Sequence, residues 1–475
     1  MQRSATFAPA DAAPAPLALL AAVAAGVAAL RLALLALNGT ELFVDEAQYW
    51  AWSREPAWGY FSKPPLIAWT IGATTALGGA ADPFWVRAAS PVLQSLAAVA
   101  VGALGAHVLG GRVGLLAGLA WLTMPGVAFG AQLISTDTVM LAPLALAILF
   151  WVRAVERPSA ATALAAGAFL GVAALGKYAA LYAVLCALLW AAAERAGRPR
   201  VRDAAIALGA AAAALAPNLI WNFAHSGATL AHTLDNAGVS TGLRPLALLE
   251  FLGAQFGVMG PLLFAAWLSA VWRAPRGPLV WFSAPIMALV ALQALRAGAN
   301  ANWAAAAFVA ATPLAAAELA RWGRRALAAS FAFGTAASVL LPLAALAPEA
   351  IPGPKGRPAF ARVLGQSAYA EEVAAVARAE GAGLILADNR ALLAALTHGL
   401  RDSPVAVAAA PRGGPPRHGW DLAETPPDAQ GATLWATLGD PGAPPPGWAA
   451  AVALPPPAPR PFMGAREPAL HRLER

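Results

Sequence analysis

Residues 45–69 read DEAQYWAWSREPAWGYFSKPPLIAW, and they interrupt a chain that is otherwise almost entirely apolar. The segment follows a first long apolar run and combines two adjacent carboxylates, several aromatic side chains and a pair of prolines. An acidic pair at such a position usually marks only a solvated helix end. The density of polar and aromatic residues nevertheless makes this segment the first candidate for a functional site.

The composition of the chain is that of a membrane protein. Of 475 residues, 59% are hydrophobic and only 12% are charged, which indicates a polytopic membrane protein. A net charge of +7 would suggest a nucleic-acid partner in a soluble protein, but here the arginines fall in short breaks between apolar segments. That pattern reports membrane topology, so no nucleic-acid partner is expected. Cys186 is the single cysteine, which excludes an intrachain disulfide and a cysteine-based metal cluster.

The length of the apolar segments predicts the number of membrane spans. A helical span needs about 20 mainly apolar residues. Eleven segments meet this condition, at 16–37, 86–109, 113–131, 138–155, 161–176, 179–193, 203–221, 249–272, 278–296, 302–319 and 326–347. A further apolar stretch at 66–80 follows two prolines and contains three glycines, so we expect it to be interfacial or re-entrant. The fold class predicted is an all-α polytopic membrane protein with about eleven transmembrane helices.

The basic residues orient these spans. With the N-terminus in the cytoplasm, every inner loop is basic, as the positive-inside rule requires, with arginines at 112, 153, 157, 195, 198, 200, 202, 273, 276, 321, 324 and 325. The outer loops then hold the unusual polar residues, at 45–63, 135–137, 177–178, 225–235 and 300–303. The plain alternative is that polar residues simply occur in loops. The segregation favours a site on the periplasmic face of the inner membrane.

The composition shifts near residue 350. Residues 1–348 are predicted to form the transmembrane catalytic domain, with 38–85 as its first periplasmic loop. Residues 349–475 are predicted to form a small periplasmic α/β domain, because GLILADNRALLAALTHGL and SPVAVAAA indicate a strand, a helix and a second strand. The stretch 439–460 is rich in proline, so extended or irregular chain is expected there.

Three carboxylates are candidates for catalysis. Asp45 and Glu46 suit a general base and its partner, because a carboxylate in a cleft near the bilayer can have its pKa tuned for deprotonating a hydroxyl. Asp137, in LISTD, lies at the same membrane boundary. Its alternative role is structural, since Ser-Thr-Asp before an apolar run is a helix N-cap signal.

Several other polar residues are candidates for binding an anionic lipid. Lys63 precedes two prolines that stiffen the chain, and Tyr60 lies beside it, so the pair suits a lipid phosphate at headgroup level. Arg31 lies inside the first apolar span, where an arginine is a functional candidate. Lys177 and Tyr178 occupy the break between two short spans. Interfacial anchoring and snorkelling are the competing explanations for these residues.

Cofactor motifs are weak in this sequence. His225 and His232 lie in an outer loop with Asp235, but their spacing is not diagnostic of a metal, and a non-metal role is favoured. A divalent metal is possible without being supported. The chain contains no Walker loop, no dinucleotide fingerprint and no Gly-x-Ser-x-Gly elbow, so the sequence gives no support for nucleotide-driven or hydrolase chemistry.

The motifs together resemble a known family. DEAQYWAWS and GYFSKPPLIAW, followed by LISTD, GKYAALY, PNLIWNFAHSG and ANWAAAAF, are similar to the bacterial branch of the GT-C glycosyltransferases. The nearest groups are the aminoarabinose lipid A transferase type and the dolichyl-phosphate-mannose protein mannosyltransferase-like proteins. The resemblance covers roughly residues 15–345.

The resemblance implies roles for individual residues. Asp45 would be the catalytic carboxylate, Asp137 would share acceptor activation or sugar positioning, and Lys63 would bind the carrier phosphate. The aminoarabinose transferases have an acidic residue before this lysine, where the present chain has Ser62, so a metal bound there in relatives is not expected here.

The sequence therefore predicts an inner-membrane glycosyltransferase that takes a sugar from a polyprenyl-phosphate carrier. The acceptor would be a lipid or a cell-envelope glycan, membrane lipids would surround the site, and the anomeric centre would be inverted. A protein acceptor is the nearest variant. A transporter or flippase of lipid-linked saccharide is the alternative of a different class, in which the same charges would line a translocation path.

Overall fold

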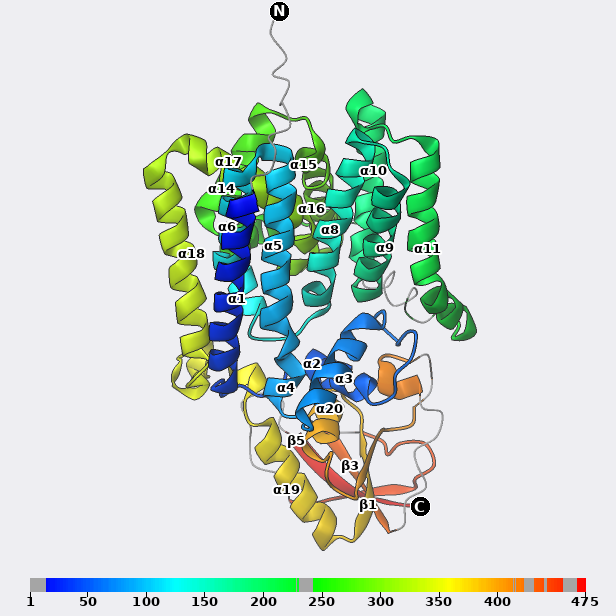
Figure 1. The fold of residues 1–475 in the computed structure, drawn as a ribbon. Coiled ribbons are helices and arrows are strands. Elements are labelled where there is room, and N and C mark those ends of the chain that lie inside the picture. The colour runs from blue at the N-terminus through cyan, green and yellow to red at the C-terminus, as the bar shows by residue number, and fades with distance from the viewer. Residues whose placement is uncertain are drawn as a thin grey trace, which may run out of the picture.

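A computed structural model describes residues 14–227, 229, 242–412, 414, 416–422, 431–439, 442–455 and 468–475. A bundle of apolar helices forms one half of the molecule, and a small mixed α/β unit lies below it (Figure 1). Between the two halves lies a layer of short helices from the first loop. This three-layer arrangement places the loop segment 45–69 between the bundle and the C-terminal sheet.

Seven helices of the described residues, some continued across a short break, are long and apolar enough to cross a membrane. Their elements are α1 (Pro14–Ala36), α4–α5 (Pro83–Arg87 and Ala89–Leu109), α8 (Thr136–Glu156), α11 (Val201–Ala224), α15–α16 (Pro278–Trp281 and Ala284–Ala297), η3–α17 (Ala301–Ala304 and Ala305–Trp322) and α18 (Arg324–Ala344). Shorter apolar helices complete the bundle, namely α6 (Gly111–Thr123), α9 (Ala160–Gly176) and α10 (Tyr182–Ala193). The structure confirms a multi-pass helical membrane protein.

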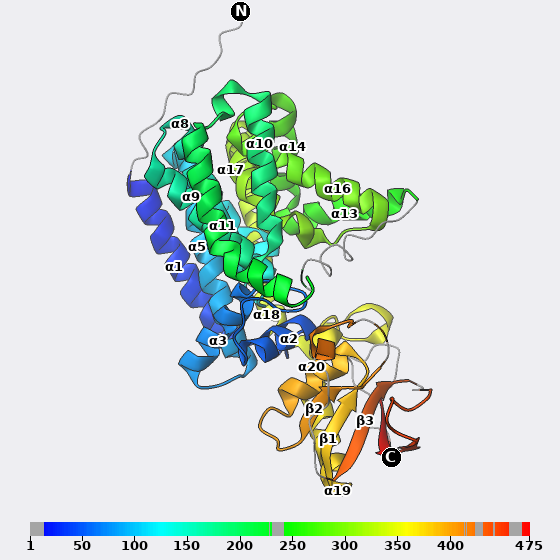
Figure 2. The same cartoon turned by 90° about the vertical axis from the view of Figure 1, so that its right-hand side faces the viewer.

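One predicted span is not a single helix. The segment expected at 249–272 consists of α13 (Pro245–Met259) and α14 (Pro261–Arg273), which are bent by 112°. The break has a local cause, because Gly260 has a φ of 95° and Pro261 begins the next helix. Figure 2 shows α13 lying beside α16, away from the upright helices. With this pair counted once, the described residues hold eleven apolar segments in the bundle, which matches the predicted number.

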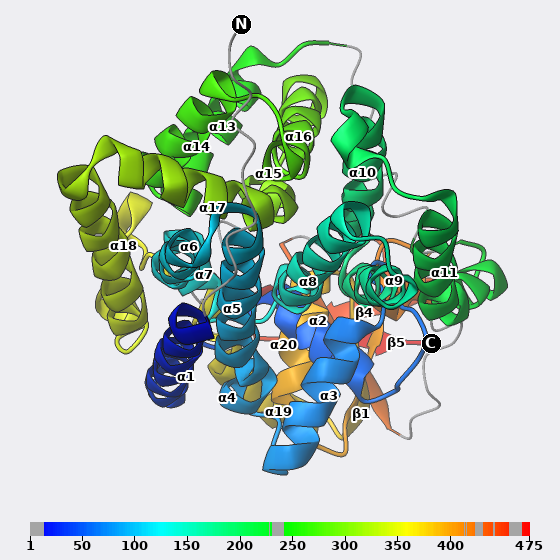
Figure 3. The same ribbon diagram turned by 45° about the horizontal axis from the view of Figure 1, so that its top comes forward.

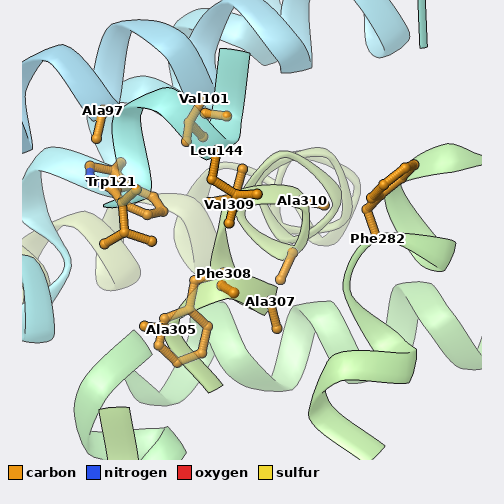
Figure 4. Close-up of a cluster of buried hydrophobic side chains, with 14 of the residues drawn as sticks. Ala97, Val101, Trp121, Leu144, Phe282, Ala305, Ala307, Phe308, Val309 and Ala310 are labelled. Carbon is orange, nitrogen blue, oxygen red and sulfur yellow. The ribbon is translucent and has the colours of Figure 1, made fainter. Parts of the chain in front are cut away.

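Small residues allow the central helices to approach closely. At the crossing of α5 and α6, a Cβ added to Gly114 would lie 2.4 Å from the Gly102 carbonyl oxygen. The alanines at the start of α17 are buried next to Trp121 and Leu144 (Figure 4). Figure 3 shows α5, α6, α8 and α17 grouped together in the bundle. Packing of this kind stabilises helices in a bilayer, where lipid is as apolar as the side chains themselves.

The first loop forms short helices beneath the bundle. These are α2 (Val44–Ser53) and α3 (Leu66–Gly78), followed by α4 at the foot of α5. With 13 residues, α3 is about 20 Å long, which is too short to span a bilayer. It lies beside α2 and α4 outside the bundle, in keeping with the interfacial placement predicted for 66–80 (Figure 1).

The C-terminal unit is built on a five-stranded sheet of order β2-β1-β3-β5-β4. Strands β1 (Ala382–Ala387), β2 (Ala406–Ala409) and β3 (Ala432–Leu438) are parallel, and β5 (Pro468–Glu474) and β4 (Ala450–Ala453) add antiparallel pairs. Helices α19 (Gln366–Ala379) and α20 (Arg390–Gly399) pack on this sheet. The strand, helix and strand predicted from the sequence are β1, α20 and β2, and β4 lies within the proline-rich stretch.

Candidate active site

Helix α2 carries both members of the acidic pair in its first turn, and the two side chains face different surroundings. Glu46 is almost fully buried and receives two hydrogen bonds from Arg87, Nε to Oε1 at 2.8 Å and Nη2 to Oε2 at 2.6 Å. The backbone amides of Ile134 and Phe43 also donate to its carboxylate, each at 2.9 Å. These four hydrogen bonds hold the first turn of α2 against the bundle and favour a structural role for Glu46. Its catalytic role stays a prediction.

Asp45 faces away from the bundle and remains 59% exposed. Its Oδ1 accepts a hydrogen bond from Nη2 of Arg390, the first residue of α20. The Nε of Arg390 donates to Gln48 on the next turn of α2, at 2.7 Å. The C-terminal unit therefore supplies a cation that contacts the candidate general base.

Asp137 lies in the first turn of α8, where Ser135 caps the helix by accepting a hydrogen bond from the Thr138 amide. The capping role considered for this motif therefore falls to the serine. The Asp137 carboxylate instead accepts from Lys177 Nζ to Oδ1 and from Asn302 Nδ2 to Oδ2, both at 2.8 Å. Three segments that are distant in sequence, which carry Asp137, Lys177 and Asn302, meet at this one carboxylate.

Lys63 lies in the loop between α2 and α3, close to the same charged groups. Burial lowers its pKa, the charge of Lys177 lowers it further, and Asp45 and Asp137 oppose the shift. Within the described part of the chain, no ion pair of Lys63 is formed. A partly buried ammonium next to two carboxylates, yet paired with neither, is suited to receive an anion.

Tyr49 is a member of the cluster that the sequence did not single out. It lies on α2 and is almost fully buried. Burial raises the pKa of its phenol well above the usual value, and Asp45 and Asp137 add to the shift. The phenol therefore stays protonated and neutral within range of the charges of the two candidate acids.

The loop that carries Lys63 is held by its own aromatic residues. The Tyr60 hydroxyl accepts from the Ala57 amide at 3.1 Å and donates within the loop to the Trp52 carbonyl at 3.0 Å. Its ring stacks on Trp52 with centroids 4.9 Å apart. The Tyr60 hydroxyl is thus used inside the protein and shapes the loop that carries Lys63, and the predicted contact of Tyr60 with the lipid stays a prediction.

Helix α11 fixes the same loop from the bundle. The Asn218 amide donates to the Trp58 carbonyl at 2.6 Å and its oxygen accepts from the Tyr178 hydroxyl at 2.6 Å. Gly59 lies so close that an added Cβ would be 2.4 Å from the Trp221 ring. Tyr178 therefore helps to brace this loop, and its predicted lipid contact stays a prediction.

Arg31 is not part of the cluster. Its Nη2 donates to the Leu122 carbonyl at 2.6 Å, near the end of α6, and the side chain is almost fully buried. Arg31 was predicted to bind the donor phosphate. Its hydrogen bond satisfies a helix-terminal carbonyl, because the break at Pro125 leaves the last carbonyls of α6 without helical partners, and the phosphate contact stays a prediction.

A metal ion has no evident ligand set here. The described residues contain no group of three or more His, Cys, Asp or Glu that could hold one. Asp45 and Asp137 are each engaged by a cationic side chain, and Ser62 stands before Lys63. His225 stacks on Trp221, and His232 and Asp235 lie outside the described residues. The absence of a metal requirement stays a prediction.

Two arginines of this region were missed at the sequence level. Arg87 lies at the edge of a predicted span, where a charge is costly unless paired, so it could have been matched to the acidic pair. Arg390 follows the predicted strand in LILADNR, at the end where ligand-binding residues of parallel sheets gather. The sequence carried no signal that this end of the sheet would face α2.

Comparison with known proteins identifies the family of this chain. Residues 62–221 match the family described as dolichyl-phosphate-mannose-protein mannosyltransferase. The chain is 38% identical over 418 residues to the lipid A galacturonosyltransferase RgtD of Rhizobium johnstonii, covering 86% of this chain and 88% of that protein. The chain belongs to the GT-C glycosyltransferases. The transporter alternative therefore gives way to an enzyme.

Solved structures of the same GT-C architecture cover nearly the whole chain. The apo structure of ArnT from Cupriavidus metallidurans matches with a TM-score of 0.63 at 15% identity, over 96% of this chain and 97% of that one. The structure of the same protein bound to undecaprenyl phosphate matches with a TM-score of 0.66 at 16% identity, over 97% and 98%. These matches show that the bundle and the C-terminal unit share the ArnT fold.

Proposed function

We propose that this GT-C glycosyltransferase moves a sugar from a polyprenyl-phosphate carrier to lipid A on the periplasmic face of the inner membrane. The relative RgtD, a lipid A galacturonosyltransferase, suggests lipid A as the acceptor and a hexuronic acid as the sugar. Undecaprenyl phosphate in the ArnT structure supports the carrier class. The observation that carries the proposal is that Lys63, without an ion-pair partner in the described chain, lies close enough to Asp45 and Asp137 for their charges to act on it.

Lys63 is assigned to the donor phosphate. When the sugar–phosphate bond breaks, negative charge builds on the phosphate oxygens, and a fixed ammonium stabilises this transition state more than the ground state. The stiff Pro64-Pro65 pair and the loop braced by Tyr60 keep Lys63 in place before the donor arrives. A preplaced cation of this kind requires little reorganisation during the reaction.

Asp45 is assigned as the general base. It is the more exposed of the two carboxylates, and among the described residues its Oδ2 has no hydrogen-bond partner. That oxygen can take the proton from the attacking hydroxyl of the acceptor as the new bond forms at the anomeric carbon. Attack from the side opposite the phosphate inverts this centre.

Asp137 is assigned a positioning role. Both of its oxygens are occupied, by Lys177 and by Asn302, so it is less available than Asp45 for accepting a proton. The pair with Lys177 holds a second ammonium beside Lys63. Glu46, Tyr60, Tyr178 and Arg31 support the scaffold around these groups.

A transfer assay tests the proposal. Purified full-length protein in lipid nanodiscs, given lipid A and a polyprenyl-phosphate hexuronate, should yield lipid A with one added hexuronate mass. Lys63→Met should lower the rate by about 10²- to 10³-fold, as loss of one preplaced charge contact does, and Lys63→Arg should recover part of it. Transfer to a protein in place of lipid A, or from a soluble nucleotide sugar only, would overturn the assignment of acceptor or donor.

The orientation can be tested separately. Cys186 is the only cysteine and is buried, so a cysteine introduced at the exposed Asp402 reports on the C-terminal unit alone. A membrane-impermeant maleimide should label Asp402→Cys in intact spheroplasts. Labelling only after lysis would place the C-terminal unit and the site in the cytoplasm.

A further inference from the structure

Arg390 is held in place by two side chains that come from the opposite end of the chain. It is the first residue of α20, directly after the Asn389 cap, so its backbone position is set by a helix start. Its Nε donates to Gln48 and its Nη2 donates to Asp45, both on α2. Gln48 is almost fully buried, which limits the orientations open to the guanidinium.

These two bonds leave part of the guanidinium available. An arginine carries five N–H donors in a planar fork, and the contacts found among the described residues use only the Nε and Nη2 nitrogens. The side chain is 40% exposed, so the remaining donors can be reached by a ligand. Carboxylates are the ligands that such a fork binds best, by two parallel hydrogen bonds.

Each of the other two cations of the cluster already has an assigned partner. Lys177 is committed to Asp137, and Lys63 is the ammonium assigned to the phosphate. Arg390 is therefore the cation next to Asp45 that has donors remaining. In a hexuronic acid the carboxylate is attached to C5, which is joined through the ring oxygen to the anomeric carbon. A group that contacts the base acting at the anomeric centre thus lies within reach of this carboxylate.

We propose that Arg390 of the C-terminal unit binds the carboxylate of a hexuronate donor and selects it over the neutral hexose. The inference rests on the proposed function and adds the residue that sets sugar selectivity. A neutral hexose carries a hydroxymethyl group at C5, which cannot form the charged, two-bond contact. The competing role for Arg390 is to orient Asp45 or to dock the C-terminal unit, and either role would serve both sugars equally.

The test compares two donors that differ only at C5. Full-length wild type, Arg390→Gln and Arg390→Lys would be assayed with polyprenyl-phosphate galacturonate and polyprenyl-phosphate galactose, using lipid A as the acceptor. Arg378→Gln on the exposed side of α19 removes the same charge from the same unit and serves as the control. Wild type and Arg378→Gln should prefer galacturonate in kcat/KM.

Arg390→Gln should lower kcat/KM for galacturonate by about 10- to 10²-fold, as for loss of a hydrogen-bonded charge, and should change galactose use much less. Arg390→Lys should keep part of the preference. Gln48→Met, which leaves the charge but removes its support, should weaken the preference even if the Arg390 variants fold poorly. An equal fall in kcat/KM with both donors would overturn the inference without contradicting the proposed transferase function. A wild type that uses neither donor would instead overturn the proposed function, and the inference with it.

Discussion

Each of two faces of α2 carries a carboxylate that is paired with an arginine. The two pairs differ in burial and in the number of hydrogen bonds that join them. Toward the bundle, Glu46 and Arg87 are both 1% exposed and bonded through two contacts. Toward the C-terminal unit, Asp45 and Arg390 are 59% and 40% exposed and share one contact. Adjacent residues of one helical turn therefore occupy a structural site and an accessible one.

The difference shows how the chain can hold an accessible carboxylate at a fixed position beside the bundle. A buried, fully bonded ion pair contributes orientation, because removing either partner would leave an uncompensated charge. That anchor fixes the first turn of α2 and so fixes the backbone of Asp45. The exposed pair keeps donors and acceptors available for substrate. The buried Glu46 thus holds the accessible Asp45 in place.

The largest expected effect comes from the exposed face. Asp45→Asn should lower the rate of sugar transfer by about 10²- to 10⁴-fold, since the amide cannot take a proton from the acceptor. The fold should be unaffected, because the buried pair remains. Initial rates measured by mass spectrometry of lipid A, beside size-exclusion profiles, would show this separation. Activity within a few-fold of wild type would make Asp45 dispensable and remove the functional half of the comparison.

Substitutions on the buried face of α2 should instead lower the stability of the protein. Arg87→Met leaves Glu46 buried without its cation and should destabilise the protein by about 3–5 kcal/mol, seen as a lower Tm in detergent. Adding Glu46→Gln should restore part of the loss, because the remaining charge is gone. Asp402→Asn, which breaks the contact with Arg401 at a side chain that is 88% exposed, is the control and should cost at most about 1 kcal/mol. An unchanged Tm for Arg87→Met would show that the pair does not anchor α2.

The sequence was sufficient for the membrane class, the number of apolar segments, the strand–helix–strand of the C-terminal unit and the convergence of Asp45, Asp137, Lys63 and Lys177. Hydrophobic length and loop charge report these features directly. It did not separate Glu46 from Asp45, because neighbouring residues on a helix face differ by about 100° in direction and only tertiary contacts decide which face is buried. The sequence also did not reveal the hydrogen-bond partners of the Tyr60 and Tyr178 hydroxyls, the Trp52 carbonyl and the Asn218 side chain, which are set by the folded structure.

A smaller effect is expected from the pH dependence of docking between α2 and α20. The Nε2–H of His398 donates to the Ala81 carbonyl oxygen at 2.7 Å, and the ring packs edge-on against Trp50. Burial lowers the pKa of His398 to about 4, with the cations of Arg401 and Arg87 adding to the shift and Asp82 opposing it. The undocked histidine takes up a proton near its ordinary pKa of about 6.5, whereas the docked one stays neutral to about pH 4. Docking is therefore strongest above pH 6.5 and weakens as the pH falls toward 4.

At pH 5 this linkage should weaken docking by about 1 to 2 kcal/mol relative to pH 7.5. Limited proteolysis of the chain between the bundle and the C-terminal unit, followed across this range, would measure it. His398→Gln can keep the hydrogen bond to Ala81 without titrating and should lower the pH dependence. A cleavage rate that changes equally in the variant would assign the dependence to other groups.

Removal of divalent metal ions by chelation is expected to have no effect, which makes it the smallest of the predicted effects. In the accessible half of the comparison, Asp45 and Asp137 are engaged by Arg390 and Lys177, and a divalent cation would have to displace these side chains to bind. Sugar transfer should therefore proceed at an unchanged rate after dialysis against EDTA. A loss of activity restored by Mg²⁺ or Mn²⁺ would contradict this prediction. It would also mean that Arg390 leaves Asp45 when the donor is bound, so that the exposed pair is a resting contact and only the buried pair persists through the reaction.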